Sequence, residues 1–477
     1  TARPRTKAAP AVALPEPFAG WFAQKGWQPR AHQLALLAQA EARRSTLLIA
    51  PTGAGKTLAG FLPSLVALHA NRDQPAKASG LRTLYISPLK ALAVDIARNL
   101  LTPIDEMGLD IRVETRTGDT PTSKRQRQRL RPPEILLTTP EQLALLLASP
   151  DAAYIFGDLD TLILDELHAL APSKRGDLLA LDVARLRTLA PSLMSIGLSA
   201  TVAQPSELRA WLTPQRTPDT TIQLADVVTV DGGAKPQIMI LETEGGMPIA
   251  SHTARYAVPD VLAAIARHRL ALIFVNTRMQ AELMFQELWK ANTESLPIAL
   301  HHGSLDVGQR RKVEAAMSRG ALRAVVATST LDLGIDWGDV DLVIHLGAPK
   351  GASRLIQRIG RANHRLDEPS NAILVPANRF EVLECRAALE AALAGEQDAV
   401  IHRKGTMDVL AQHVLGMACA GPFHADALYE EVRAALPYTG LSRIDFDRVV
   451  DFVATGGYAL RQYERFASSP MRKAAGA

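Results

Sequence analysis

The chain has little of what marks secreted or membrane proteins. Its 477 residues include two cysteines, Cys385 and Cys419, whose spacing fits neither a disulfide framework nor a zinc knuckle. We expect both to be reduced core residues. No apolar run approaches the roughly 20 residues that a membrane-spanning helix needs. The stretch Thr1–Pro17 lacks the apolar core of a secretion signal, so we expect a flexible tail and a cytoplasmic protein.

The chain also lacks a strong excess of either charge. Its net charge is +4 and its pI is near 9.0, which permits a polyanionic partner but does not demonstrate one. The hydrophobic fraction of 47% is ordinary for a globular protein, with no bias toward disorder. A length of 477 residues exceeds what one core can hold, so several domains are expected. The chain begins at Thr1, without a Met, which suggests a processed or shortened protein.

Short apolar runs recur between helical stretches, which is the pattern of parallel α/β units with strands buried on both faces. The pattern occurs twice, and Thr213–Asp219 is a turn-rich stretch between the two series. The first series of strands is expected at 47–50, 84–87, 135–139, 162–165 and 196–199. The second is expected at 272–275, 298–301, 324–328, 342–345 and 373–375.

Beyond Gln397 the strand pattern gives way to helices. They are expected at 407–420, 425–435 and 443–455, and a strand is expected at 458–466 after two glycines. This order is typical of a winged helix, with a generic helical extension as the alternative. A second wing strand would have to follow the end of the chain.

Ala50–Thr57 reads APTGAGKT, between an expected strand and a helical pattern. In a P-loop, backbone N–H groups surround the phosphates, the lysine reaches the β and γ phosphates, and the hydroxyl holds magnesium. Lys56 and Thr57 would take the last two roles. Ala50 stands where the strict pattern has glycine, and a Gly-rich helix start is the alternative. The expected nucleotide contacts here are Thr52, Gly53, Gly55, Lys56 and Thr57.

Asp165 and Glu166 follow an apolar run, at the carboxyl end of an expected strand, where ligands bind in open α/β sheets. Asp165 would hold Mg²⁺ through water, and Glu166 would polarise the attacking water. Either carboxylate alone would indicate a solvated acidic turn. Together with the P-loop they predict a hydrolase with ATP and Mg²⁺ as cofactors.

Two neighbouring strings resemble other catalytic motifs but do not fit them. His168 lacks the HExxH spacing of zinc sites, so zinc is rejected. Gly197–Thr201 lacks the closing glycine of a nucleophile elbow. Its hydroxyls fit better as a relay between the nucleotide site and elsewhere. The expected coupling residues are His168, Ser199, Thr201 and Gln357.

Gln357–Arg365 reads QRIGRANHR and supplies three arginines in the second α/β series. Positive charge aimed at the γ-phosphate is worth about 10³ to 10⁵ in rate. An arginine provided by the second domain would make hydrolysis depend on closure of the two domains. A basic helix face is the alternative.

Taken together and in this order, these strings resemble the superfamily 2 helicases of the DExH type. The matching strings also include SPLKALAVD (87–95), TGD (117–119), TTPEQL (138–143), LIFVNTR (272–278) and ATSTLDLGIDWGDVD (327–341). More narrowly, GIDWGDVD and the tail FVATGGYALRQYERF (452–466) resemble the large-helicase-related family. Within that family, the bacterial ligase-associated DNA-damage-response helicases are the most similar.

The resemblance implies two tandem RecA-like P-loop domains, an α/β class, followed by a mostly helical winged-helix domain. The expected bounds are a tail at 1–20, lobe 1 at 21–215, lobe 2 at 216–397 and an incomplete winged helix at 398–477. The resemblance also implies a further C-terminal domain, which we do not expect within this sequence. The implied activity is ATP-driven 3′ to 5′ translocation on single-stranded DNA.

The resemblance also implies roles for single residues. Gln33 matches a glutamine that reads adenine, with an exposed helical glutamine as the alternative. Asp336 matches an acid that contacts the ribose, and Arg361 matches the first arginine finger. Arg365 is the expected second finger, although His364 occupies the usual slot.

Motors that read no base sequence grip phosphates through backbone N–H groups, hydroxyls and a few cations. The candidates here are Pro88, Lys90, Thr139, Arg278 and Thr328. Trp337 would stack on a base or pack between the lobes. Lys124–Arg131 carries five basic residues in eight, and a solvated helix face is favoured over nucleic-acid contact.

Three functions remain open from the sequence. The first is a helicase that unwinds DNA or RNA:DNA duplexes in DNA repair, near the nucleoid. The second is a nucleotide-gated clamp that displaces bound protein, and the third is an RNA helicase. The expected partners are single-stranded DNA or an RNA:DNA hybrid, together with repair proteins such as a ligase or nuclease.

Overall fold

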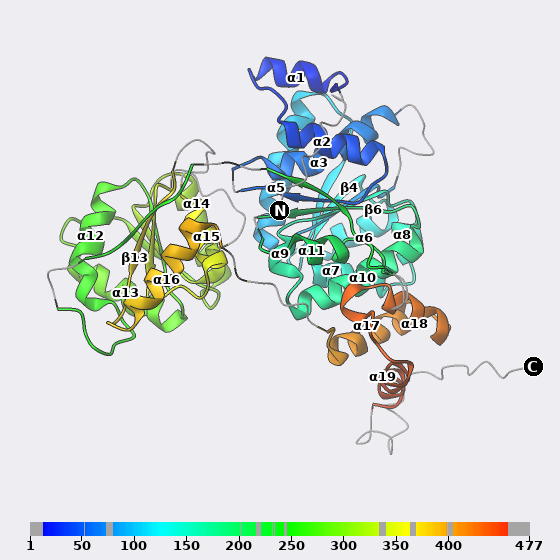
Figure 1. The fold of residues 1–477 in the computed structure, drawn as a ribbon. Helices are drawn as coiled ribbons and strands as arrows, with labels where there is room; N and C mark the ends of the chain where they lie inside the picture. The colour runs from blue at the N-terminus through cyan, green and yellow to red at the C-terminus, as the bar shows by residue number, and fades with distance from the viewer. Residues whose placement is uncertain are drawn as a thin grey trace, which may run out of the picture.

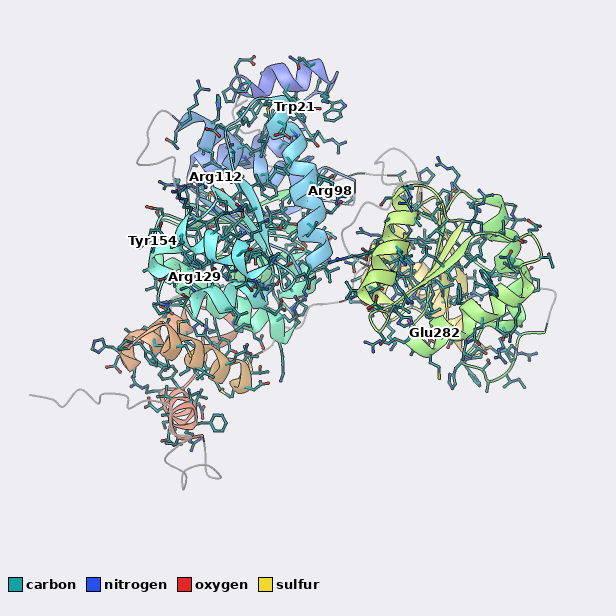
Figure 2. All side chains as sticks on the ribbon, turned by 180° about the vertical axis from the view of Figure 1, so that it is seen from behind. Trp21, Arg98, Arg112, Arg129, Tyr154 and Glu282 are labelled. Carbon is teal, nitrogen blue, oxygen red and sulfur yellow. The ribbon has the colours of Figure 1, made fainter. Side chains whose placement is uncertain are left out.

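The chain forms two parallel-sheet lobes and a C-terminal group of helices (Figure 1). The structure is a computed structural model that describes residues 13–51, 53–72, 80–200, 202–215, 221–230, 232, 234–242, 246–332, 340–362, 369–396, 398 and 404–456. Lobe 2 stands beside lobe 1, while the C-terminal helices lie against lobe 1, as the view from behind also shows (Figure 2). Within the described ranges, no helix is long and apolar enough to cross a membrane.

Lobe 1 is built on seven parallel strands in the order β3-β4-β2-β5-β6-β1-β7. The five inner strands are buried along their whole length, which is why they consist of continuous apolar runs. The strands are β1 (Thr46–Ile49), β2 (Thr83–Ile86), β3 (Val113–Arg116), β4 (Ile135–Thr138), β5 (Thr161–Leu164), β6 (Met194–Ser199) and β7 (Asp226–Thr229).

Helices cover both faces of this sheet, as expected for parallel crossover connections (Figure 1). They are α1 (Phe18–Gln24), α2 (Ala31–Glu41), α3 (Lys56–Ala70), α5 (Lys90–Glu106), α6 (Thr122–Leu130), α7 (Pro140–Leu147), α8 (Ala152–Phe156), α9 (Leu167–Leu170), α10 (Lys174–Leu189) and α11 (Pro205–Trp211).

Lobe 2 is built on six parallel strands in the order β10-β11-β9-β12-β13-β8. The strands are β8 (Gln237–Ile240), β9 (Ala271–Phe274), β10 (Ile298–His301), β11 (Ala324–Ala327), β12 (Leu342–Leu346) and β13 (Asn371–Val375). The helices are η1 (Arg255–Ala257), α12 (Val258–Arg267), α13 (Arg278–Ala291), α14 (Val307–Ser318), η2 (Ser329–Leu331), α15 (Ala352–Ile359) and α16 (Glu381–Ala394).

The ten predicted strands are confirmed to within two residues, but β3, β7 and β8 were missed. All three lie at a sheet edge and are only partly buried. VETR and DVVT lack a long apolar run, whereas QIMI contains a short one that the prediction did not include. Because β7 was not predicted, the predicted lobe boundary at 215/216 is also wrong. β7 pairs with β1 through Thr46 and Asp226, and therefore belongs to the sheet of lobe 1.

Two smaller expectations are also corrected. The predicted tail at 1–20 overlaps α1, which begins at Phe18 because that side chain and Phe22 are buried in lobe 1. Cys385 is buried as expected, but Cys419 is exposed because it lies on the outer face of its helix.

The C-terminal helices are α17 (Met407–Ala420), α18 (Ala425–Arg433), η3 (Leu436–Tyr438) and α19 (Arg443–Thr455), which confirms the three predicted helices. Both α17 and α18 pack on α10 of lobe 1, so that α10 is buried on nearly all sides. Polar pairs fix this docking: Asp182 with His413 at 3.5 Å and Arg185 with Glu431 at 3.2 Å. The strand expected at 458–466 lies outside the described residues.

Candidate active site

The loop between β1 and α3 has the geometry of a phosphate-binding loop. Gly53 and Gly55 have φ angles of 77° and 74°, a conformation that residues with a Cβ rarely adopt. The loop leads directly into α3, whose first residues are Lys56 and Thr57, so the positive end of the helix dipole lies at the loop. This arrangement suits a polyphosphate. Thr52 lies outside the described residues.

The alanine that departs from the strict P-loop pattern is explained by the sheet. Ala50 extends β1, because its N–H donates to the carbonyl of Ser199 at 3.1 Å. Its backbone is not left-handed and its side chain is fully buried. A glycine is therefore not needed at this position.

Lys56 lies among the charged groups of the site. Its Nζ donates to the carbonyls of Ala50 at 2.9 Å and Pro51 at 3.2 Å. Burial lowers the pKa of Lys56, while the charges of Glu166 and Asp165 raise it. The ammonium is thus held next to both carboxylates, where a γ-phosphate would have to lie.

Gln33 is buried beside the P-loop, which excludes the alternative of an exposed helical glutamine. Its Oε1 accepts from the N–H of Arg30 at 2.8 Å, which caps α2. Its Nε2 points toward the loop, because a methyl group added at Gly55 would lie 3.7 Å from it. The structure therefore brings Gln33 to the nucleotide site.

The two carboxylates stand at the carboxyl end of β5, beside β6. The N–H of Glu166 donates to Oδ1 of Asp165 at 2.9 Å. Glu166 has a φ of 48°, and a left-handed conformation costs a non-glycine residue about 1–3 kcal/mol. Such strain persists where the surroundings over-determine it, and it is common at functional sites.

The environments of the two carboxylates set their pKa values apart. Burial and the neighbouring Glu166 charge raise the pKa of Asp165 to about 6. Burial would also raise the pKa of Glu166, but the neighbouring His168 and the positive charges of Lys56 and Arg361 outweigh it and lower that pKa. Glu166 is therefore ionised at neutral pH, whereas Asp165 gains its proton just below neutral pH.

Tyr85 is a site residue that sequence reasoning missed. It lies in β2 next to β5, and its hydroxyl donates to Oδ2 of Asp165. Its ring is fully buried and stacks on Phe61 with centroids 5.2 Å apart. A tyrosine in an otherwise aliphatic buried strand was the available signal, since a buried hydroxyl needs a partner.

His168 links the carboxylates to β6. Its Nδ1 accepts from the N–H of Ala200 at 3.4 Å, and Ser199 Oγ lies 3.3 Å from the same nitrogen. The proton therefore sits on Nε2, which lies 3.5 Å from Oε2 of Glu166. Burial lowers the pKa of His168 and keeps it neutral. The predicted pair His168 and Ser199 is thus brought together next to Glu166.

Arg361 brings lobe 2 to this site. It follows α15, is buried, and its Nε donates to the carbonyl of Gln357 at 3.5 Å. Its positive charge contributes to the lowered pKa values of Lys56, Glu166 and His168, all in lobe 1. The expected coupling residue Gln357 contacts Arg361 through its backbone, and its Nε2 is buried without a hydrogen-bond partner in the described part of the chain.

The structure gives two of the three clustered arginines, Arg358 and Arg361, different surroundings. Arg358 is buried inside lobe 2, where Nε donates to Asp332 at 2.8 Å and the guanidinium lies over the ring of Phe274. Arg358 therefore holds the helix in place and does not face lobe 1. Four further candidates, Thr201, Asp336, Trp337 and Arg365, lie outside the described residues.

In each lobe, the candidates for nucleic-acid contact follow a different group of strands from the groups that bind the nucleotide. In lobe 1 they follow β2, β3 and β4, while the nucleotide groups follow β1, β5 and β6. Lys90 is exposed and pairs with Asp119 at 3.3 Å, which joins the loops after β2 and β3. Pro88 and Thr139 are buried at their strand ends.

Lobe 2 repeats this layout. Arg278 follows β9 and Thr328 follows β11, its neighbour in the sheet. Arg278 is exposed, and a methyl group added at Gly303 would lie 3.8 Å from its guanidinium. Thr328 is buried. The two exposed cations, Lys90 and Arg278, thus stand on corresponding edges of the two sheets.

The basic run at 124–131 forms α6 and its end, as predicted. Arg127 pairs with Glu114 at 2.8 Å, and Arg125 donates to the carbonyl of Gly118 at 2.7 Å. Arg129, paired with Asp151, lies on the side of lobe 1 away from lobe 2 (Figure 2). These partners support the interpretation as a solvated, structural helix face.

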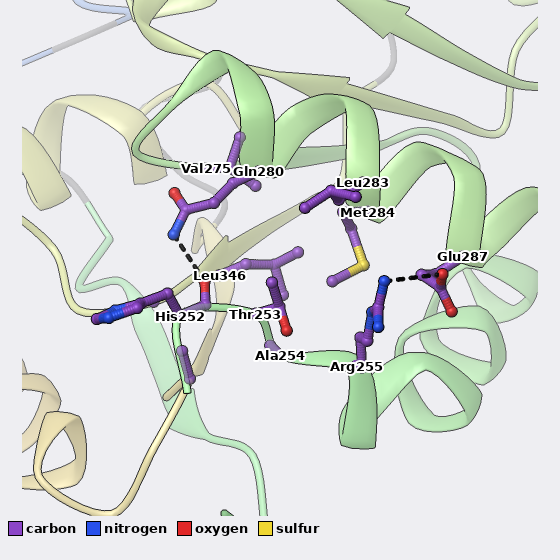
Figure 3. A pocket seen from close by; sticks show the side chains of 12 residues that line it. His252, Thr253, Ala254, Arg255, Val275, Gln280, Leu283, Met284, Glu287 and Leu346 are labelled. Carbon is purple, nitrogen blue, oxygen red and sulfur yellow. Dashed lines mark hydrogen bonds and ion pairs between the residues drawn. The ribbon is translucent and has the colours of Figure 1, made fainter. Parts of the chain in front are cut away.

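Lobe 2 has a shallow pocket at the carboxyl ends of β9, β12 and β13 (Figure 3). Its polar groups pair with one another: Gln280 donates to the carbonyl of His252 at 2.8 Å, and Arg255 pairs with Glu287 at 3.4 Å. The chain after β8 contains no GKT string. This pocket therefore lacks the phosphate-binding elements of lobe 1.

A P-loop lobe joined to a second lobe that contributes an arginine defines the class of RecA-like nucleotide-dependent motors. Comparison with known families agrees with this class. Residues 30–208 match the DEAD/DEAH box helicase family, and residues 256–365 match the helicase conserved C-terminal domain. Residues 390–475 match the winged-helix domain of the large helicase-related protein. The chain belongs to the large-helicase-related (Lhr) family, with two RecA-like lobes and a winged-helix domain.

Individual relatives give the extent of the likeness. ATP-dependent helicase Lhr-Core protein 2 of Thermococcus barophilus is 37% identical over 461 residues, covering 94% of this chain and 53% of that protein. Lhr helicase/probable uracil glycosylase of Mycolicibacterium smegmatis is 34% identical, covering 91% of this chain and 31% of that protein. The chain thus spans about half of the first relative and about a third of the second.

A solved structure supports the same fold. Mycobacterium smegmatis helicase Lhr, bound to ssDNA and AMP-PNP, has a TM-score of 0.79 and 34% identity. The match covers 91% of this chain and 57% of that one. The DUF1998 helicase MrfA bound to DNA, at 24% identity and a TM-score of 0.71, shows the shared fold alone.

Proposed function

We propose that the chain hydrolyses ATP to move along single-stranded DNA. The position of Arg361 carries the proposal, because a charge from lobe 2 acts on Lys56 and Glu166 of lobe 1. Hydrolysis would then depend on how the lobes sit against each other, and the nucleotide would in turn change that arrangement. Closure linked to a ligand needs only different affinities in the open and closed states.

The chemistry follows from the protein groups around the loop. The ionised Glu166 accepts a hydrogen bond from the attacking water and orients it toward the γ-phosphorus. Lys56 and Arg361 would neutralise the charge on the transferring phosphoryl group while the bond to the leaving oxygen breaks. Gln33, whose Nε2 points toward the loop, would receive the adenine.

Magnesium suits the donor set that the site offers. Mg²⁺ prefers oxygen ligands and keeps several waters, so one carboxylate, one hydroxyl and the phosphates suffice. Asp165 and Thr57 supply such a carboxylate and hydroxyl. When bound there, Mg²⁺ would supply positive charge that offsets the charge of the phosphates.

The nucleic-acid strand would run past Lys90 and Arg278, along the strand ends that carry the candidates for nucleic-acid contact in both lobes. Two lobes that grip phosphates by turns would advance along a strand. The Mycobacterium smegmatis relative is described with ssDNA, which supports DNA as the track. Movement from 3′ to 5′, separation of DNA or RNA:DNA duplexes and a role in repair at the nucleoid rest on the family resemblance. So do the ligase-associated subgroup and a ligase or nuclease partner.

The first experiment measures ATP turnover with single-stranded DNA, RNA and duplex DNA in parallel at fixed salt, since salt alone changes nucleic-acid affinity. We expect stimulation by single strands, and its loss in Lys56→Ala and Glu166→Gln. Lys290→Ala, which removes an exposed lysine of lobe 2, is the control and should turn over normally. Unchanged turnover in both site variants would refute the assignment.

A second experiment separates unwinding from clamping. Strand displacement is followed on duplexes with a 3′ or a 5′ single-stranded tail, and displacement from the 3′ tail is expected. ATP-dependent removal of a DNA-bound protein without duplex separation would favour the clamp. Faster turnover with RNA than with DNA would favour an RNA helicase.

A further inference from the structure

The helix that precedes Arg361 is held inside lobe 2 by ion pairs. Asp332 accepts from Nε of Arg354 and from Nε of Arg358, each at 2.8 Å. Nη1 of Arg358 also lies 2.6 Å from Nε2 of His345. These contacts fix side chains of α15 inside the lobe. They do not provide an acceptor for the backbone N–H groups in the first turn of the helix.

That first turn is held by a residue from the segment that leads into the winged-helix domain. The carboxylate of Asp398 accepts from the N–H of Ser353 at 3.0 Å and of Ala352 at 3.4 Å. The N–H of Asp398 in turn donates to Oγ of Ser353 at 2.8 Å. An acid at this end also complements the helix dipole. Asp398 is therefore the N-terminal cap of α15, although it lies 45 residues beyond Ser353.

Gly351, directly before α15, leaves the space that the Asp398 carboxylate occupies. Its φ is 102°, a conformation that other residues rarely adopt. A methyl group added here would lie 2.4 Å from Oδ2 of Asp398, closer than any real contact. Both the backbone conformation and the space for the carboxylate thus require glycine.

The cap joins two parts of the protein that contact different lobes. Eight residues after Asp398, Thr406 donates through its N–H and hydroxyl to Asp177 of α10 in lobe 1, both at 3.4 Å. There α17 begins and docks on lobe 1. The chain therefore runs from the start of the arginine-bearing helix of lobe 2 to the winged-helix domain seated on lobe 1.

We propose that Asp398 is a positioning residue for Arg361, which links the winged-helix domain to ATP hydrolysis. The inference rests on the proposed function and deepens it. From Ala352 to Arg361 a helix would measure about 14 Å, so a tilt of about 5° moves the far end by about 1 Å. A displacement of that size can reduce catalysis by up to about 100-fold.

The test compares ATP turnover of single variants at saturating single-stranded DNA. Asp398→Ala should lower kcat about ten-fold and leave KM for ATP within about two-fold, because the P-loop is untouched. Asp398→Asn should restore most of kcat, since asparagine caps helices as well as aspartate. Gly351→Ala should reproduce the defect, and combining it with Asp398→Ala should add little, as expected for one shared contact.

Asp306→Ala is the matched control. Asp306 caps α14 of the same lobe, accepting from the N–H of Gly308 at 2.7 Å and of Gln309 at 3.4 Å. Both Asp306→Ala and Asp398→Ala should lower thermal stability, but Asp306→Ala should leave kcat unchanged. An equal fall of kcat in both variants would overturn the proposal, because loss of lobe stability would then explain it. A normal kcat in Asp398→Ala would also overturn it.

Amide hydrogen exchange tests the cap without any activity. Asp398→Ala should lose protection at Ala352 and Ser353, and unchanged protection there would overturn the proposal. If the unaltered chain hydrolysed no ATP, the proposed function would fail, and exchange would still decide whether the cap exists.

Discussion

Replacing Tyr85 by phenylalanine should move the pH dependence of ATP hydrolysis. The hydroxyl of Tyr85 donates to Asp165 and so stabilises its charged form. Without that donor the pKa of Asp165 must rise above its value of about 6. In the proposed role of Asp165, only the ionised carboxylate would hold Mg²⁺, so activity should be lost as the pH falls through this pKa. In Tyr85→Phe the loss should therefore begin at a higher pH.

The size of the effect follows from the bond that is removed. A hydrogen bond to a charged group is worth about 1.5–3 kcal/mol. Since about 1.4 kcal/mol corresponds to one pKa unit, the acidic limb should move up by about one to two pH units. The ring itself remains packed on Phe61, because phenylalanine has the same shape. The fold should therefore be retained.

The assay is kcat against pH between about 5 and 9, the range in which a carboxyl of this pKa titrates. Raising the Mg²⁺ concentration should move the limb back down, since Mg²⁺ and the proton compete for Asp165. Tyr256→Phe is the control, because it removes a hydroxyl bonded to the carbonyl of Pro376 in lobe 2. Superimposable profiles of Tyr85→Phe and the unaltered chain would refute the reasoning.

Three further predictions concern the finger, the fold and the cysteines. Arg361→Ala should lower kcat about 10³-fold while retaining single-strand binding, whereas Arg386→Ala, which removes an exposed arginine on α16, should not; a fall below about ten-fold would contradict the finger role. Gly176→Ala should lower the free energy of unfolding by about 1–3 kcal/mol, measured by urea titration, because the added methyl would lie 2.1 Å from a backbone carbonyl; Gly440→Ala, with open space around it, should be neutral. A maleimide should label Cys419 in the native protein and Cys385 only after unfolding, as counted by mass spectrometry, and two labels on the native chain would contradict the described burial.

Much of the site could be predicted from sequence because its parts are local. The P-loop needs a strand, two glycines and a helix start within a few residues, and APTGAGKT contains them all. Asp165 and Glu166 directly follow a buried strand. Tyr85 could not be predicted as their partner, because only the order β2-β5 in the sheet places it beside Asp165.

By itself, the sequence determined the inner strands, the P-loop and its acidic partner, and the three C-terminal helices. In each of these a short periodic pattern is enough to decide the local structure. The edge strands β3, β7 and β8, the lobe boundary and the different surroundings of Arg358 and Arg361 were decided only by the tertiary structure. They depend on which side of a sheet or helix meets another part of the chain. The cap of α15 by Asp398 is of the same kind, because no local pattern joins residues 45 positions apart.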